Sequence, residues 1–120
     1  MKISAIDHVQ LAMPAGQEEK ARDFYARLLD LREKPKPPEL AVRGGVWFEN
    51  DSVKIHLGID PEFRPARKAH PALIVSDLAA LIARLRGAGF EVIDDELVRY
   101  HRVYVSDPFG NRIELIDGGA

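Results

Sequence analysis

The sequence predicts the same order of strands and helix twice along the chain. In each half, a short strand leads into an amphipathic helix, and further strands follow. His8 lies at the start of the first half and His70 at the start of the second, while Ile55-His56-Leu57 and Ile113-Glu114-Leu115 stand at corresponding points in their last strands. A repeat of this kind predicts two copies of one supersecondary unit, each covering a sheet with its own helix.

The start of the first half combines a strand pattern with a helix pattern. Residues 5–13 contain β-forming residues and end at Pro14, which predicts a strand running into a loop. From Gln17 to about Asp30 apolar side chains recur at the spacing of one helix face. The members of this stripe are Ala21, Phe24, Tyr25, Leu28 and Leu29.

The rest of the first half is interrupted by prolines. Residues 34–40 contain three prolines in seven residues, so we expect a loop or an irregular sheet edge there. Residues 44–50 and 52–60 predict two strands joined by a tight turn at Asn50-Asp51.

The second half repeats this order. Residues 70–77 predict a short apolar strand, and a helical stripe from Leu78 follows, with Asp77 or Ser76 as the N-cap and Gly89 as the C-cap. Three further strands are expected over residues 90–94, 100–107 and 111–117. Both halves therefore predict the order β-α-β-β-β.

Alternation along the strands places chemistry-bearing side chains on one face. His56 lies opposite Ile55 and Leu57, and Glu114 lies opposite its apolar neighbours in the same way. Because the apolar faces must contact the helices, these two side chains face either solvent or a concave pocket. If the sheet curls, seven side chains converge on one cavity: His8, His56, His70, Glu114, Tyr100, Tyr104 and Arg102. Imidazole and carboxylate together suit Zn, Ni, Co, Fe or Mn.

Other polar and aromatic residues have weaker signals. Phe48 continues the alternation of the core, which leaves Trp47 as a pocket candidate. Arg67 precedes His70 in a loop, where it is either solvated or anchors an anionic substrate group. His101 falls on the apolar face near a strand start, so we expect a structural or surface role.

The composition restricts the possible partners. A chain of 120 residues with a net charge of −2 has the size of one soluble domain and offers no electrostatic reason to bind nucleic acid or an anionic membrane. The absence of cysteine excludes disulfides and thiolate metal ligands. Neither a signal peptide nor an apolar run of membrane-spanning length is present, so we expect a cytoplasmic protein.

Three segments together resemble the vicinal oxygen chelate superfamily, which includes glyoxalase I, extradiol dioxygenases, and the fosfomycin and bleomycin resistance proteins. They are DHVQLAM with FYARLLDL following, HPALIVSDLAALIARLRGAGFEV, and VYVSDPFGNRIELID. The resemblance spans residues 1–120 as a single domain and implies an α+β fold. It implies two βαβββ modules, about 4–60 and 69–117, forming a curled mixed sheet around a metal site with the helices on the outer face.

The resemblance also implies a ligand set. The family's ligand positions fall on His8, His70 and Glu114, and a further ligand position of glyoxalase I falls on His56. Short members are usually homodimers, in which the site takes the first two histidines from one chain and the second pair from the other. Ala12 stands where glyoxalase I usually carries an arginine that helps to hold glutathione.

Three functions remain open on this basis. The first is a metal-dependent glyoxalase-like lyase or isomerase, in which a divalent ion holds two vicinal oxygens of a small substrate, Glu114 moves a proton, and four residues bind substrate. Those four are Trp47, Arg67, Arg102 and Tyr104. The second is an extradiol-type Fe(II) or Mn(II) dioxygenase with His56 as a pocket residue. The third is a non-catalytic dimeric protein that binds a small molecule or drug, like the bleomycin resistance proteins.

Overall fold

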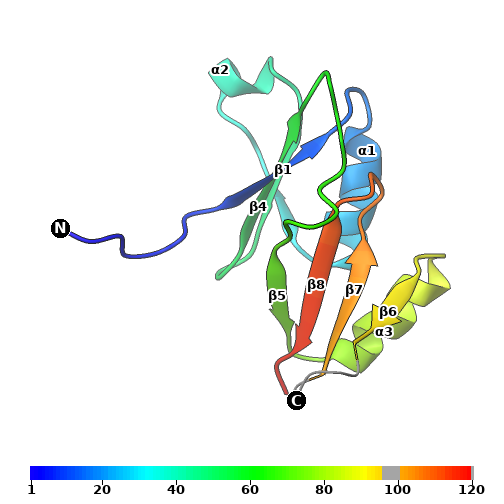
Figure 1. Ribbon diagram of the computed structural model, residues 1–120. Helices are drawn as coiled ribbons and strands as arrows, with labels where there is room; N and C mark the ends of the chain where they lie inside the picture. Colours follow the sequence, from blue (N-terminus) through cyan, green and yellow to red (C-terminus); the bar gives the residue numbers. More distant parts are fainter. Residues whose placement is uncertain (96–100, 120) are drawn as a thin grey trace. The chain divides into compact units, whose positions relative to one another are not determined.

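The sheets of the protein follow one strand order twice. The computed structural model describes residues 1–95 and 101–119 and divides into two compact units, Met1–Arg64 and Pro65–Ala120. The first unit holds a four-stranded sheet of order β1-β4-β3-β2, and the second holds one of order β5-β8-β7-β6 (Figure 1). In both sheets the first strand pairs in parallel with the last, and the other pairs are antiparallel. The α+β class with two βαβββ modules is therefore confirmed, each module forming its own mixed sheet.

The first unit contains four strands and three helical segments. They are β1 (Val9–Met13), α1 (Glu18–Ala21), the π-helix η1 (Arg22–Leu28), β2 (Arg32–Lys34), α2 (Pro38–Ala41), β3 (Val46–Glu49) and β4 (Lys54–Ile59). The strand expected over residues 5–13 begins only at Val9, so His8 lies just before it.

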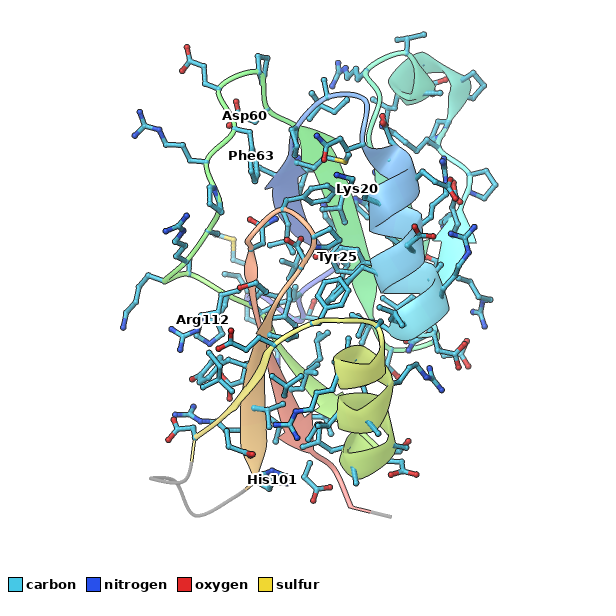
Figure 2. The ribbon with its side chains drawn as sticks, turned by 90° about the vertical axis from the view of Figure 1, so that its right-hand side faces the viewer. Lys20, Tyr25, Asp60, Phe63, His101 and Arg112 are labelled. Carbon is cyan, nitrogen blue, oxygen red and sulfur yellow. The ribbon has the colours of Figure 1, made fainter. Side chains whose placement is uncertain are left out.

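The α1 and η1 segments form the helix that the apolar stripe predicts. Its second part, η1, is wound more widely than an α-helix, and at its end the Leu29 N–H donates to the Phe24 carbonyl five residues earlier at 2.9 Å. Asp30 then adopts a left-handed φ of 62° and ends the helix where the pattern predicts. Tyr25 is fully buried and its ring stacks on Phe48 of β3 at 5.4 Å, so this helix covers the apolar face of the first sheet (Figure 2).

The proline-rich segment holds more structure than its composition suggests. Lys34 is the last residue of β2, which pairs with β3 as an edge strand, and Pro38 opens α2. Proline is well suited to the first turn of a helix, because the N–H groups of that turn have no acceptor within the helix and the N–H that proline lacks is not needed. Residues 34–40 are therefore a sheet edge followed by a helix start.

The second unit contains four strands and one helix. They are β5 (Ala72–Val75), α3 (Leu78–Gly87), β6 (Val92–Asp94), β7 (Arg102–Ser106) and β8 (Arg112–Asp117). The Asp77 side chain accepts from the Ala80 N–H at 3.2 Å, which confirms it as the N-cap of α3. The prediction for Tyr100 lies outside the described residues.

The two faces of the second sheet differ as the alternation predicts. On one face, α3 contacts β6 and β8. The buried side chains of this face are Val92, Val103, Val105, Ile113 and Leu115. On the other face lie Arg102, Tyr104, Arg112 and Glu114. Within the ranges that the structure describes, no helix has the length and apolar character needed to cross a membrane.

Candidate metal and substrate site

The second unit brings its two predicted metal ligands into contact. His70 Nε2 lies 2.9 Å from Glu114 Oε1, and Glu114 is almost fully buried. β5 pairs with β8 in parallel, with Ala72 opposite Glu114, so His70, two residues before β5, reaches the β8 carboxylate. The strand pairing is therefore the direct structural cause of this contact.

The second nitrogen of His70 shows which of its atoms is free to bind a cation. His70 Nδ1 lies 2.8 Å from the Lys68 carbonyl, which can only accept, so Nδ1 carries the proton and donates. In a neutral imidazole, Nε2 then holds a lone pair that faces the Glu114 carboxylate. Two such acceptors at 2.9 Å require a proton or a cation between them. Metal-binding histidines commonly donate the other ring N–H to a backbone carbonyl in this way.

Arg102 holds the other oxygen of the same carboxylate. Its Nη1 donates to Glu114 Oε2 at 3.3 Å and its Nη2 donates to Asp95 Oδ2 at 2.6 Å. The hydrogen bond to Asp95 is the largest cause that raises the pKa of Arg102, and the bond to Glu114 adds to it. The guanidinium therefore fixes Glu114 with one oxygen directed to Arg102 and the other to His70.

The first unit brings its predicted ligands together as an aromatic stack. The rings of His8 and His56 lie 4.2 Å apart with 17° between their planes, and Trp47 lies 4.1 Å from the other face of His56 at 7°. Trp47 and His56 are opposite one another in the β3–β4 pair. On the other side of β4, β1 pairs in parallel with it, and His8 directly precedes the first paired residue, Val9. The stack thus follows from the pairing of three strands.

The environment keeps His56 neutral. Burial is the main cause that lowers the pKa of His56, and the charge of His8 lowers it further. His8 Nδ1 lies 2.9 Å from Asp7 Oδ2 and donates to it, which leaves His8 Nε2 available as a ligand. The same bond is the largest cause that lowers the pKa of Asp7.

The donor atoms of the second unit fit a divalent cation. Two cis ligands at about 2.1 Å from an ion are about 3 Å apart, which matches the 2.9 Å between His70 Nε2 and Glu114 Oε1. In the first unit, the stacked rings of His8 and His56 hold their nitrogens in nearly parallel planes, so the nitrogens do not point at one common position. His8 must therefore turn before it can share an ion with His56. The His8 side chain is 41% exposed and has room to do so. Among the described residues, no group of three or more His, Asp or Glu side chains is gathered around one point.

A pocket of about 450 Å³ lies beside the Glu114 row on the second sheet. Its lining includes Arg67 from the loop before β5, Tyr104 and Ser106 from β7, and Arg112 from β8. Arg112 lies on the side of the sheet away from α3 (Figure 2), with its guanidinium 3.8 Å from the centroid of the Tyr104 ring. The pocket therefore contains two of the predicted substrate-binding residues, Arg67 and Tyr104.

Two pocket residues, Ser106 and Arg112, were missing from the predicted site. The alternation contains the signal for both, because Arg112 lies two residues before Glu114 and Ser106 two residues after Tyr104 on the same face. His101 lies outside the site, exposed at the surface with Nε2 2.9 Å from Asp94 Oδ1, as its predicted surface role requires.

Residues 5–115 match the Glyoxalase/Bleomycin resistance protein/Dioxygenase superfamily. No curated protein matches the chain.

Solved structures resemble the chain over nearly its whole length. A structure described as a glyoxalase family protein from Bacillus anthracis is 47% identical, with a TM-score of 0.93 and coverage of 98% of this chain and 97% of that one. A mutant of the fosfomycin resistance protein FosX from Listeria monocytogenes, complexed with Mn(II) and 1S,2S-dihydroxypropylphosphonic acid, is 16% identical, with a TM-score of 0.82 and coverage of 98% and 94%. The antibiotic binding protein TnmS3 from Streptomyces sp. CB03234 is 26% identical, with a TM-score of 0.68 and coverage of 96% and 98%.

Proposed function

Because the chain belongs to the glyoxalase/bleomycin resistance protein/dioxygenase superfamily, we propose that it is a metal-dependent, glyoxalase-like lyase or isomerase that acts on a small molecule. The proposal rests mainly on the contact between His70 and Glu114. His70 donates from Nδ1 to the Lys68 carbonyl and so turns Nε2 toward a buried carboxylate at 2.9 Å. A divalent cation between Nε2 and Oε1 would satisfy both atoms, and both are of the ligand types that such ions take in proteins.

The proposed ligand set contains four side chains. His70 Nε2 and Glu114 Oε1 supply one pair of donors, and His8 and His56 supply the other. His56 suits this role because its lowered pKa keeps the imidazole neutral at neutral pH. When bound, the cation supplies a Lewis acid that stabilises negative charge on a substrate oxygen.

Glu114 is the proposed proton-transfer group. Arg102 holds Oε2 at 3.3 Å, while Oε1 is directed toward His70 and would exchange a proton with a substrate only when it is not bound to the cation. Burial reduces competition from water and strengthens the electrostatic interactions of this carboxylate. Trp47, Arg67, Arg102 and Tyr104 are the proposed substrate contacts.

Metal titration of chelator-treated protein tests the proposal. We expect Mn(II), Zn(II) or Ni(II) to bind, and His70→Ala and Glu114→Gln to weaken binding by at least about 10- to 100-fold. His101→Ala is the matched control, because the ring of this exposed histidine bonds to the surface carboxylate of Asp94 and lies outside the candidate site. Metal affinity that is unchanged in both site variants would contradict the proposal.

Substrate assays then separate the reactions. Isomerisation of a hemithioacetal by the metal-loaded protein would support the glyoxalase-like reaction. Ring cleavage of a catechol with Fe(II) would instead favour the dioxygenase reaction.

The proposed homodimer has its own test. One preparation carries His8→Ala and His56→Ala, and the other carries His70→Ala and Glu114→Gln. If each site takes one pair from each chain, mixing the two inactive preparations restores intact sites in the hybrid dimers. Activity that stays absent while hybrid dimers form would place both pairs of one site in the same chain.

The aromatic stack favours a second candidate, a non-catalytic protein that binds a small molecule. Trp47, His56 and His8 lie face to face, an arrangement that suits stacking on a flat ligand better than it suits chelation. The similarity to TnmS3, which is named as an antibiotic binding protein, agrees with this reading. For this candidate we expect ligand affinity to remain unchanged after the metal is stripped.

A further inference from the structure

We propose that the pocket beside Glu114 binds the oxyanion group of the substrate, so that the substrate is a small organic acid. The inference deepens the proposed function and rests on it for the location of the reaction, whereas the binding of the acid group depends on the second unit alone. Its basis is the charge, construction and position of the pocket.

The pocket has two cationic side chains in its lining. Arg67 and Arg112 both line it, and within the described part of the chain no ion pair engages either guanidinium. Among the described residues, Glu91 is the one carboxylate in the lining, so the cations there exceed the anions. A guanidinium binds carboxylate and phosphate oxygens through paired N–H donors, and Ser106 adds a hydroxyl donor.

The walls of the pocket suit the carbon skeleton of an organic acid. Arg112 lies 3.8 Å from the Tyr104 ring, so the aromatic face positions the guanidinium. Ile93 also lines the pocket and is 55% exposed, which leaves an apolar side chain available to a ligand. A volume of about 450 Å³ lies within the range of small-molecule sites.

The loop that carries Arg67 is fixed to the turn that precedes Arg112. Asn111 is fully buried; its side-chain oxygen accepts from the Ala66 N–H at 3.0 Å, and the Arg112 N–H donates to the Ala66 carbonyl at 2.8 Å. Gly110 has a φ of 93°, and a Cβ there would lie 3.1 Å from Pro65. The two arginines are therefore held on backbone segments that are bonded to each other.

The register of the sheet places this pocket next to the proposed proton-transfer group. Tyr104 pairs with Glu114, and Ser106 pairs with Arg112, so the acid-binding row is the next row on the same face. Residues two apart on a strand are separated by about 6.7 Å. A short-chain acid can therefore contact Arg112 with its acid group while its other end reaches Glu114. Tyr104 links the rows, because its ring also contacts His70 edge to face at 5.5 Å.

Anion titration of metal-free protein tests the inference, with binding followed through the backbone amide signals of Ser106 and Gly110 in NMR spectra. Inorganic phosphate and succinate are the two probes, and the one that binds more tightly identifies the class of acid group. We expect Arg67→Gln and Arg112→Gln to weaken binding about tenfold or more. Arg64→Gln is the matched control, because Arg64 is exposed nearby in the chain and does not line the pocket.

Arg67→Gln keeps the test valid if Arg112→Gln alters folding, because Arg67 is an exposed loop residue. Probes that fail to shift the two amides, or that bind equally well to Arg67→Gln and the unchanged protein, would overturn the inference. Chelator is present throughout, so this outcome leaves the metal titration of the proposed function unaffected. If the unchanged protein binds no divalent metal but still binds phosphate or succinate, the proposed function is refuted and the anion site is supported.

Discussion

Replacing Asn111 with alanine should destabilise the protein through the turn between β7 and β8. The Asn111 side chain is fully buried, accepts from the Ala66 N–H at 3.0 Å and donates from Nδ2 to Asp107 Oδ2 at 3.0 Å. Loss of the neutral bond costs about 1 kcal/mol, and loss of a bond to a carboxylate costs about 1.5–3 kcal/mol. The expected decrease in the free energy of unfolding is therefore about 2.5–4 kcal/mol.

Urea unfolding of the metal-free protein measures this decrease. With an m-value of about 2 kcal/mol/M, the midpoint should fall by about 1–2 M. Asn50→Ala is the matched control, because Asn50 Oδ1 also accepts two hydrogen bonds, from the Ser52 and Val53 N–H groups, at an exposed turn. Water replaces the lost partner at an exposed site, so this control should lose about 1 kcal/mol or less.

The comparison between the two asparagines decides the outcome. If Asn111→Ala loses no more free energy of unfolding than Asn50→Ala, burial of the Asp107–Asn111 turn does not contribute as argued. The variant should also bind phosphate or succinate more weakly, because Ala66 and the neighbouring Arg67 lose an attachment to the turn. Unchanged anion binding in a folded Asn111→Ala variant would show that the hydrogen bond does not position Arg67.

Three further results should follow from the stack and from the glycines. Trp47 is the only tryptophan and stacks on His56, so its fluorescence should titrate with a midpoint below pH 6.5, and His56→Gln should abolish the transition. The His56 imidazole binds a proton more readily in the unfolded chain than in the folded one. The free energy of unfolding of metal-free protein should therefore fall on acidification from pH 6.5 to the folded pKa of His56, and the profile should be flatter in His56→Gln. Gly110→Ala should cost more than about 1 kcal/mol in a thermal melt because of its positive φ and its contact with Pro65, whereas Gly87→Ala in α3 should stabilise by about 0.5–1 kcal/mol; equal effects would contradict the argument.

Much of the fold could be predicted because its signals are periodic. The alternation around Val103 and Val105 identified the buried face of β7, since a half-buried strand repeats every two residues. The repeat placed metal-capable side chains at corresponding points of the two halves, and the family resemblance implied the two pairs whose members lie together: His8 with His56, and His70 with Glu114.

The remaining features depend on contacts that a local pattern does not encode. β2 and α2 share a proline-rich segment in which Pro38 suits a helix start as well as a loop. The wide winding of η1 depends on how the helix packs on its sheet. The free nitrogen of His70 depends on the position of the Lys68 carbonyl, which is a property of the folded loop. Arg112 was accessible to the alternation argument and was simply not included.

The parallel pairing of β1 with β4, and of β5 with β8, has a consequence for the order of folding. Each ladder closes within its own half of the chain, so the first sheet requires no strand made after Ile59. During synthesis, the N-terminal sheet should therefore gain protease resistance before β5 has emerged from the ribosome. Stalled nascent chains of increasing length can reveal this, and resistance that appears only after β8 has emerged would indicate that the halves fold together. Vectorial folding of this kind would shorten the time during which β1 is an unpaired strand edge open to aggregation.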